Sequence, residues 1–105
     1  VAAVEAATGS PAHVCAGGPD RVSQIGVVTG GAGSQIYEMA ATGIDTFITG
    51  EGPHWSFTSA EELGVNLIYG GHYATETFGV KALAERWCES NEGLTWSFID
   101  HPTGL

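Results

Sequence analysis

The chain has 105 residues, of which 43% are hydrophobic and 10% aromatic, and this composition is typical of one globular domain rather than of a disordered segment. The formal net charge is −9 with only three Lys and Arg residues, so the chain lacks the basic clusters that bind nucleic-acid phosphates. No apolar run is long enough to span a bilayer, and the first residues lack the basic region of a signal peptide. We therefore expect a cytoplasmic protein that binds neither nucleic acid nor membranes.

The first predicted elements are short. Residues 2–7 (AAVEAA) read as the tail of a helix already under way, which suggests a piece of something longer. A short strand is expected at His13–Ala16. Cys15 and Cys88 lie far apart and form no C-x-x-C motif, so both are expected to be free thiols in a reducing compartment.

Three segments then follow one plan, in which a β-branched apolar run leads into a glycine turn and a helical pattern. The predicted strands end at Thr29, Thr49 and Tyr69, at intervals of 20 residues, and a glycine follows each of them. No other positions recur, so the spacing does not indicate a solenoid. A strand, a tight turn and three helical turns need about this length in any layered α/β protein.

The predicted helices have recognisable limits. The first runs from about Ser34, a good N-cap residue, to Gly43, which suits the position after a helix. The second can begin at Pro53, which is tolerated in the first turn, and ends before Gly64.

The third helix carries the clearest amphipathic pattern, and we expect its apolar stripe to pack on the sheet. This apolar stripe consists of Val80, Leu83, Ala84, Trp87 and Cys88.

After this helix, a last strand is predicted at 94–100 (LTWSFID), following a turn at 91–93.

Alternating strands and helices predict a single α/β domain over residues 1–105, with three layers, a largely parallel or mixed sheet of about five strands and three main helices. The carboxyl ends of parallel strands share one edge, and open α/β sheets bind ligands there. The polar and glycine residues that follow strand ends are therefore expected to meet at this edge: the turn 30–33, Glu51, His54, His72 and Glu76.

The GGAG turn at 30–33 does not match a dinucleotide-binding fingerprint, because Ile36 occupies the last glycine position, and it lacks the Lys of a P-loop. Two interpretations remain open. The turn, including Gly31 and Gly33, could present backbone N–H groups to an anion. It could equally be a tight strand-to-helix turn that a Cβ would crowd.

The GEGPHW stretch (50–55) places Glu51 and His54 at the start of the second helix. A helix N-terminus disfavours the protonated imidazole, so a neutral His54 could accept a proton or polarise a substrate. The alternative is a surface histidine that bonds only to its own loop.

His72 and Glu76 lie four residues apart in GGHYATETF (70–78). If the helix includes His72, the two side chains lie one turn apart on one face; if Thr75 is the N-cap, His72 lies in the loop beside Glu76. Either arrangement lets an imidazole and a carboxylate share one cation. Spacing alone leaves open an ordinary capped surface helix.

Together these motifs resemble the C-terminal part of the Nif-three-like (NGG-one interacting factor three) proteins, often labelled GTP cyclohydrolase I type 2 homologues. The match rests on the GGAG turn (30–33), TGE-x-x-H (49–54), G-H-Y-A-T-E (71–76) and the closing D-H-P. It implies a C-terminal α/β lobe, a pair of divalent metal ions (Zn, Fe, Mn or Mg) with His72 and Glu76 among the ligands, and assembly into homo-oligomers, commonly hexamers.

By the same resemblance His54 matches a family position that lines the same cavity, where we expect it to act in catalysis by orienting the substrate or transferring a proton. We also expect Gly31, Gly33 and Glu51 to contact the substrate. It implies a metal-dependent hydrolase acting on a nucleotide or another phosphate-bearing small molecule. The alternative is a non-catalytic module that binds or delivers metal or contacts other proteins. The His-His pair and the aspartate that complete the family's site do not occur here, so we expect this chain alone to bind metal weakly and to be inactive.

Overall fold

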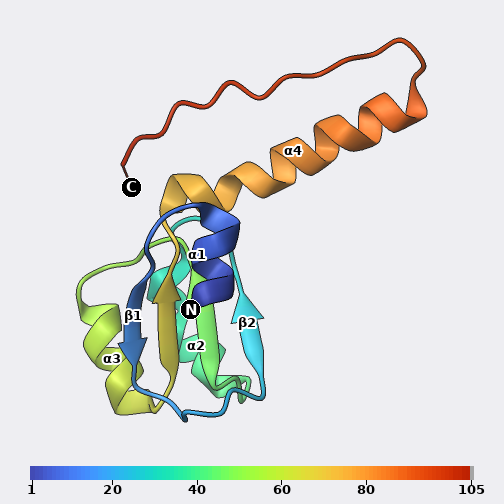
Figure 1. Cartoon of the computed structure of the whole chain (residues 1–105). Coiled ribbons are helices and arrows are strands. Elements are labelled where there is room, and N and C mark those ends of the chain that lie inside the picture. Colours follow the sequence, from blue (N-terminus) through green and yellow to red (C-terminus); the bar gives the residue numbers. More distant parts are fainter. Residues whose placement is uncertain (105) are drawn as a thin grey trace.

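The computed structural model describes residues 1–104 and forms a four-stranded sheet with helices on both faces (Figure 1). The strand order is β1-β4-β3-β2; β2, β3 and β4 are parallel, and β1 is antiparallel to β4. The α/β class and the mixed sheet are confirmed, with four strands rather than about five. The elements are α1 (Ala2–Thr8), β1 (His13–Ala16), β2 (Ile25–Val27), the 3-10 helix η1 (Ala32–Gln35), α2 (Ile36–Ala41), β3 (Thr46–Thr49), α3 (Trp55–Leu63), β4 (Asn66–Tyr69) and α4 (His72–Ser90).

The core lies between the sheet and the helices α2 and α3. Phe47 and Leu67 come from the two central strands, face the same side of the sheet as register partners, and are completely buried. Ile36 of α2 and Ala60 of α3 are also completely buried against them. Burial of each large apolar side chain stabilises the fold by about 1.5–3 kcal/mol, so this layer is the main source of stability.

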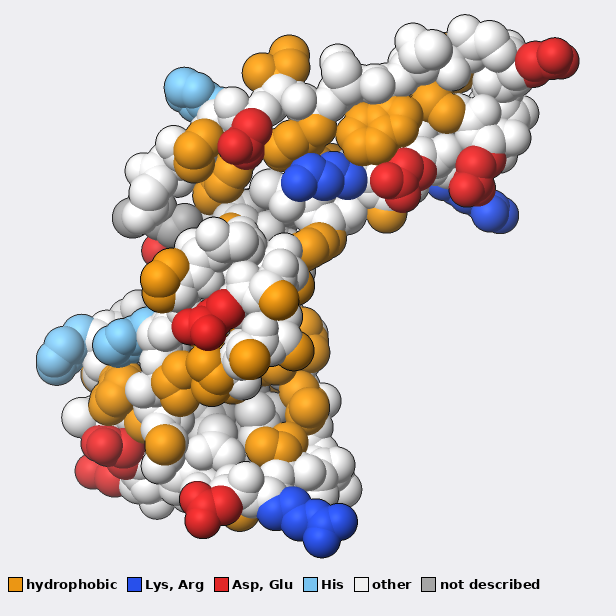
Figure 2. Space-filling model, viewed as in Figure 1, with side chains coloured by type: hydrophobic (Ala, Val, Ile, Leu, Met, Phe, Trp, Pro, Cys, Tyr) orange, Lys and Arg blue, Asp and Glu red, His pale blue; other side chains and the backbone are white. Residues whose placement is uncertain are grey.

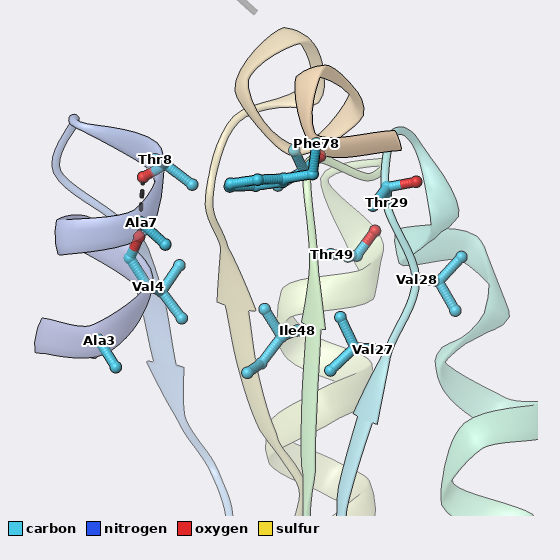
Figure 3. Close-up of a pocket in the computed structure, with 11 residues that line it drawn as sticks. Ala3, Val4, Ala7, Thr8, Val27, Val28, Thr29, Ile48, Thr49 and Phe78 are labelled. Carbon is cyan, nitrogen blue, oxygen red and sulfur yellow. Dashed lines mark hydrogen bonds between the residues drawn. The ribbon is translucent and has the colours of Figure 1, made fainter. Parts of the chain in front are cut away.

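The opposite face of the sheet is covered only in part. The helix α1 lies over it (Figure 1), and Val4 approaches Ile48 and Val27 across a hollow that Phe78 closes at one end (Figure 3). The hollow has a volume of about 240 Å³ and its walls are apolar. The third layer of the predicted architecture is therefore a single short helix.

Two helix starts differ from the prediction. Ser34 does not cap a helix: it lies inside η1, and α2 begins only at Ile36. The end of α2 is as predicted, because Gly43 follows it with a φ of 84°, a conformation that favours glycine. The helix α3 begins at Trp55, two residues after Pro53, whose carbonyl accepts the N–H of Ser56 in the turn that leads into it.

Asp45 fixes the strand β2 beside β3. Its Oδ2 accepts the backbone N–H groups of Ser23 (2.8 Å) and Gln24 (3.0 Å) and the Ser23 hydroxyl (2.6 Å). The hydrogen bond from the Ser23 hydroxyl is the main reason why the pKa of this carboxyl falls to about 2. This anchor aligns the edge strand that carries the GGAG turn.

The prediction that the apolar stripe of α4 packs on the sheet is wrong. The helix extends away from the sheet (Figure 1), and Val80, Leu83 and Trp87 are 57%, 51% and 61% exposed. The radius of gyration is accordingly 15.7 Å, against about 12.9 Å for a compact domain of this length. Amphipathic periodicity identifies the face that requires burial, but it does not identify the surface that buries it.

The strand predicted at 94–100 is also absent from the described residues. This segment runs back along α4 instead of pairing with the sheet (Figure 1). Lys81 lies over the Phe98 ring at 4.2 Å, and the Tyr73 hydroxyl donates to Asp100 at 2.9 Å. Because its side chains contact α4, the segment stays away from both sheet edges.

Within residues 1–104, no helix combines the length and hydropathy that crossing a membrane would require. Cys15 is buried and Cys88 partly buried, and both are free thiols as predicted. Burial raises the pKa of the Cys15 thiol and so disfavours its thiolate form.

Candidate functional site

Three loops meet at the carboxyl edge of the parallel strands. The GGAG turn follows β2, Glu51 follows β3, and α4 begins at His72, three residues after the end of β4. Backbone hydrogen bonds join them: the N–H groups of Gly50 and Glu51 donate to the Gly30 carbonyl, and that of Gly71 donates to the Gly50 carbonyl. The parallel register therefore brings together segments that are 20 to 41 residues apart in sequence.

The helix α4 includes His72, which decides between the two geometries considered above. Gly71 is the N-cap, with a φ of 91°, and His72 is the first helical residue. Thr75 is not a cap but lies inside the first turn, 7% exposed, where its hydroxyl accepts the N–H of Gly30 at 3.0 Å. His72 and Glu76 thus lie one turn apart on the same face.

The imidazole of His72 lies between two carboxylates. Its Nε2 is 3.4 Å from Oε1 of Glu76, and its Nδ1 is 2.8 Å from Oε1 of Glu51. The hydrogen bond to Glu51 is the main reason why the pKa of His72 is raised, and the negative charge of Glu76 acts in the same direction. All three side chains are partly exposed, at 36% for His72, 43% for Glu51 and 56% for Glu76.

Gly30 and Gly31 line the other side of this cluster. A Cβ at Gly30 would lie 2.5 Å from Oε1 of Glu76 and 3.3 Å from Nε2 of His72. Gly30 also has a φ of 72°, which other residues rarely adopt. At Gly31 the nearest atom to a Cβ would be Cε1 of His72 at 3.4 Å. The two glycines therefore keep open the space beside the imidazole and the Glu76 carboxylate.

The backbone N–H groups of the GGAG turn are largely engaged within the fold. Gly30 donates to Thr75, Ala32 to the Thr49 hydroxyl at 3.2 Å, and Gly33 to the Glu51 carbonyl at 3.0 Å. Gly33 is buried and faces Tyr69 rather than the cluster, because a Cβ there would overlap the Tyr69 hydroxyl. The tight-turn interpretation therefore accounts for Gly33 without a ligand.

His54 lies beside the cluster rather than in it. It precedes the first residue of α3 and is exposed. Together with Glu51 it lines a separate cavity between α3 and the strands β1 and β4. Glu51 is therefore the residue that connects this cavity to His72 and Glu76.

The geometry fits a partial metal site. Donor atoms 3.4 Å apart can share one cation whose bonds are about 2.0–2.2 Å long, and one imidazole with one carboxylate suits several divalent metals. Within residues 1–104, however, no group of three or more His, Cys, Asp and Glu side chains is arranged to hold a metal ion. His72 and Glu76 would therefore fill only part of the coordination shell of a metal ion.

Some residues of this region were not identified from the sequence. The hydroxyls of Thr75 and Thr49 accept hydrogen bonds from the GGAG turn, and the hydroxyls of Tyr69 and Ser56 are hydrogen-bonded to each other. A buried hydroxyl at a strand end has no local signature, because its partners come from other segments. The Tyr-Gly step at 69–70 was interpreted only as the end of a strand.

Comparison with known proteins adds three kinds of similarity. Residues 1–103 match the family model described as Duf34/NIF3 (NGG1p interacting factor 3). A Deinococcus radiodurans protein named "GTP cyclohydrolase 1 type 2 homolog" is 44% identical over 102 residues, which cover 97% of this chain and 38% of that protein. The chain therefore spans about two fifths of the length of this curated relative.

Two solved structures agree closely with the fold. A structure titled "protein ybgI, unknown function" aligns with a TM-score of 0.88 at 39% identity, covering 97% of this chain and 41% of that one. The protein TTHA1606 from Thermus thermophilus aligns with a TM-score of 0.83 at 45% identity, covering 97% and 40% of the two chains.

Proposed function

Because the chain belongs to the Duf34/NIF3 family, we propose that it forms part of a metal-dependent hydrolase that acts on a nucleotide or another phosphate-bearing small molecule. The observation that carries the proposal is the arrangement around His72, where Nε2 faces the Glu76 carboxylate at 3.4 Å and Nδ1 bonds to Glu51 at 2.8 Å.

In this proposal His72 and Glu76 hold a divalent cation and Glu51 orients His72. A carboxylate can only accept a hydrogen bond, so within the neutral imidazole Glu51 selects the tautomer that has its proton on Nδ1. Nε2 then carries the lone pair on the side of Glu76. Metal-binding histidines usually donate their second N–H to a carboxylate or a carbonyl in this way.

The remaining ligands are proposed to come from the part of the longer relatives that this chain does not span, or from another copy. Two ions, of Zn, Fe, Mn or Mg, are proposed for the whole protein. A bound divalent cation makes water a nucleophile near neutral pH and polarises a phosphoryl or carbonyl oxygen. His54 is proposed to orient the substrate or transfer a proton, and Gly31 to contact the substrate through its backbone.

The activity is tested by incubating the whole protein with Mn²⁺ or Zn²⁺ and a panel of nucleoside mono- and triphosphates, with product analysis by chromatography. We expect turnover that His72→Ala abolishes. Stoichiometric metal binding and release without turnover of any nucleotide would instead favour the second candidate, a metal-binding or metal-delivery protein. That candidate is supported by the exposure of the pair, because an accessible site exchanges its ion readily.

Replacing Glu51 tests its role towards His72 separately from the ligands. Glu51→Ala removes the acceptor at Nδ1 and is expected to weaken metal binding by the whole protein about 10- to 100-fold. Glu51→Gln keeps an acceptor oxygen and is expected to have a smaller effect. Isothermal titration calorimetry measures both affinities, and Glu85→Ala, an exposed carboxylate on α4, is the matched control. Equal affinities of Glu51→Ala and wild type would exclude the orienting role.

We also propose that the protein self-associates through the apolar side of α4. Figure 2 shows hydrophobic side chains gathered along this helix, and Val80, Leu83 and Trp87 are all more than half exposed. Exposed apolar surfaces of this kind usually mark contacts with other chains. Light scattering on the 105-residue chain at moderate salt is expected to detect oligomers that Leu83→Glu dissociates and Glu85→Gln does not. A monomeric wild-type chain would contradict this proposal.

A further inference from the structure

A second cavity lies at the same edge of the sheet, next to the candidate metal site. It has a volume of about 390 Å³, within the range of small-molecule sites, and Glu51 belongs to both places. Its lining combines the rings of Phe57, Tyr69 and two histidines with one carboxylate. We call it the aromatic pocket; its residues are His13, Glu51, Gly52, Pro53, His54, Phe57, Thr58 and Tyr69.

Three of the rings that line the aromatic pocket lie close to one another. His13 of β1 and Tyr69 of β4 are register partners, so both side chains lie on the α3 side of the sheet. Their rings are nearly parallel, with an interplanar angle of 8° and centroids 6.4 Å apart. The Phe57 ring of α3 lies 5.4 Å from His13 at an angle of 44°. Such rings bind another flat ring by stacking, whatever its detailed substituents.

The tyrosine wall is held in place before any ligand binds. The Tyr69 hydroxyl is hydrogen-bonded to Ser56, whose side chain is completely buried and also bonds to the Pro53 carbonyl. A Cβ at Gly33 or Gly52 would overlap the same hydroxyl, so both glycines leave room for it. A wall that is already ordered costs little conformational entropy when a ligand binds.

The charges at the aromatic pocket favour a nitrogen-containing ring over a phosphate group. None of its eight residues is Lys or Arg, so a phosphate group would find no fixed positive charge there. The Glu51 carboxylate accepts hydrogen bonds only, and a ring that carries N–H or NH₂ groups on its edge can supply them. A neutral nitrogen heterocycle therefore suits this cavity better than an anion does.

We infer that the aromatic pocket binds the planar ring of a purine-like nitrogen heterocycle, which stacks on His13, Phe57 and Tyr69 and donates a hydrogen bond to Glu51. That this ligand is a substrate rests on the proposed function. With its ring in this pocket, the rest of that molecule extends past Glu51 towards His72 and Glu76. The pocket thus supplies the specificity for the ring, and the adjacent site acts on the remainder.

The test is a titration of the metal-free 105-residue chain with guanosine and, separately, with ribose 5-phosphate, followed by NMR of the aromatic and imidazole protons. Guanosine is expected to shift the ring signals of His13 and Tyr69 saturably, and ribose 5-phosphate is expected to leave them unchanged. His13→Ala and Phe57→Leu are expected to weaken guanosine binding at least about tenfold. The matched controls are His101→Ala and Phe78→Leu, which lie outside the pocket and should bind as wild type does.

Two results would overturn the inference. One is a response to ribose 5-phosphate at the same signals, which would make the cavity a phosphate site. The other is guanosine binding that both pocket variants leave intact, or no guanosine binding at all. Because the titration uses metal-free protein, guanosine binding by His72→Ala would support the pocket even if no metal bound at His72. Metal bound at His72 without ring binding would leave the proposed hydrolase standing and remove only the pocket.

Discussion

Replacing His72 or Glu76 with alanine is expected to lower the metal affinity of the whole protein by at least about 100-fold. In the proposed site, each change removes one of the two side chains that would share the cation. A directly bound ligand should matter more than an outer hydrogen-bond partner, whose loss typically costs 10- to 100-fold. Metal content after dialysis and calorimetric titration with Zn²⁺ and Mn²⁺ measure the effect.

The controls for this experiment come from the same helix. Glu85→Ala removes a carboxylate of equal charge and should leave the affinity unchanged, so a general electrostatic effect is separated from coordination. Thermal unfolding of the metal-free variants should resemble that of wild type, because His72 and Glu76 are partly exposed. Unchanged metal affinity in both alanine variants would refute the assignment of these two residues as ligands.

Gly50→Ala is expected to destabilise the protein by about 3 kcal/mol and to disturb the site at the same time. A Cβ at Gly50 would lie 2.6 Å from the Gly30 carbonyl oxygen and 2.7 Å from both the His72 Cα and the Thr75 hydroxyl. Two of these three atoms belong to backbone, so the GGAG turn and the start of α4 must move apart. Overpacking of this kind usually costs 1–3 kcal/mol or more.

Gly79→Ala is the opposite case and serves as the matched control. Gly79 lies inside α4, and a Cβ there would have no neighbour within 4 Å. Alanine is favoured over glycine in a helix interior by about 0.5–1 kcal/mol, so this variant is expected to be slightly more stable than wild type. Chemical denaturation of both variants compares their free energies of unfolding. Equal stabilities would mean that the turn around Gly50 adapts freely.

Much of the sheet could be predicted from the sequence because its signals are local. Apolar runs that end in Thr-Gly or Tyr-Gly identify the strand ends near Thr29, Thr49 and Tyr69, and alternation with helices indicates parallel pairing. The direction of α4 and the path of 94–100 could not be predicted in this way. Both depend on which surface the apolar side chains of these segments pack against, and no local pattern in this chain specifies that surface.

In the candidate site, too, contacts within one helix could be predicted from the sequence, and contacts between distant segments could not. The pairing of His72 with Glu76 follows from helical spacing once the helix is known to start at His72. The hydrogen bond from His72 to Glu51, in contrast, joins residues 21 positions apart and arises from the register of β3 and β4. The aromatic pocket was missed for this reason too, since β1 brings His13 beside Tyr69 only through antiparallel pairing.

The claim that His72 and Glu76 hold a metal ion is tested most directly by anomalous X-ray scattering from crystals of the whole protein grown with Mn²⁺ or Zn²⁺. A metal ion held by this pair should give an anomalous peak within about 2.0–2.3 Å of both Nε2 of His72 and a carboxylate oxygen of Glu76. Glu51 should keep its hydrogen bond to Nδ1. Anomalous peaks found only elsewhere, with neither side chain in contact with a metal ion, would contradict the assignment.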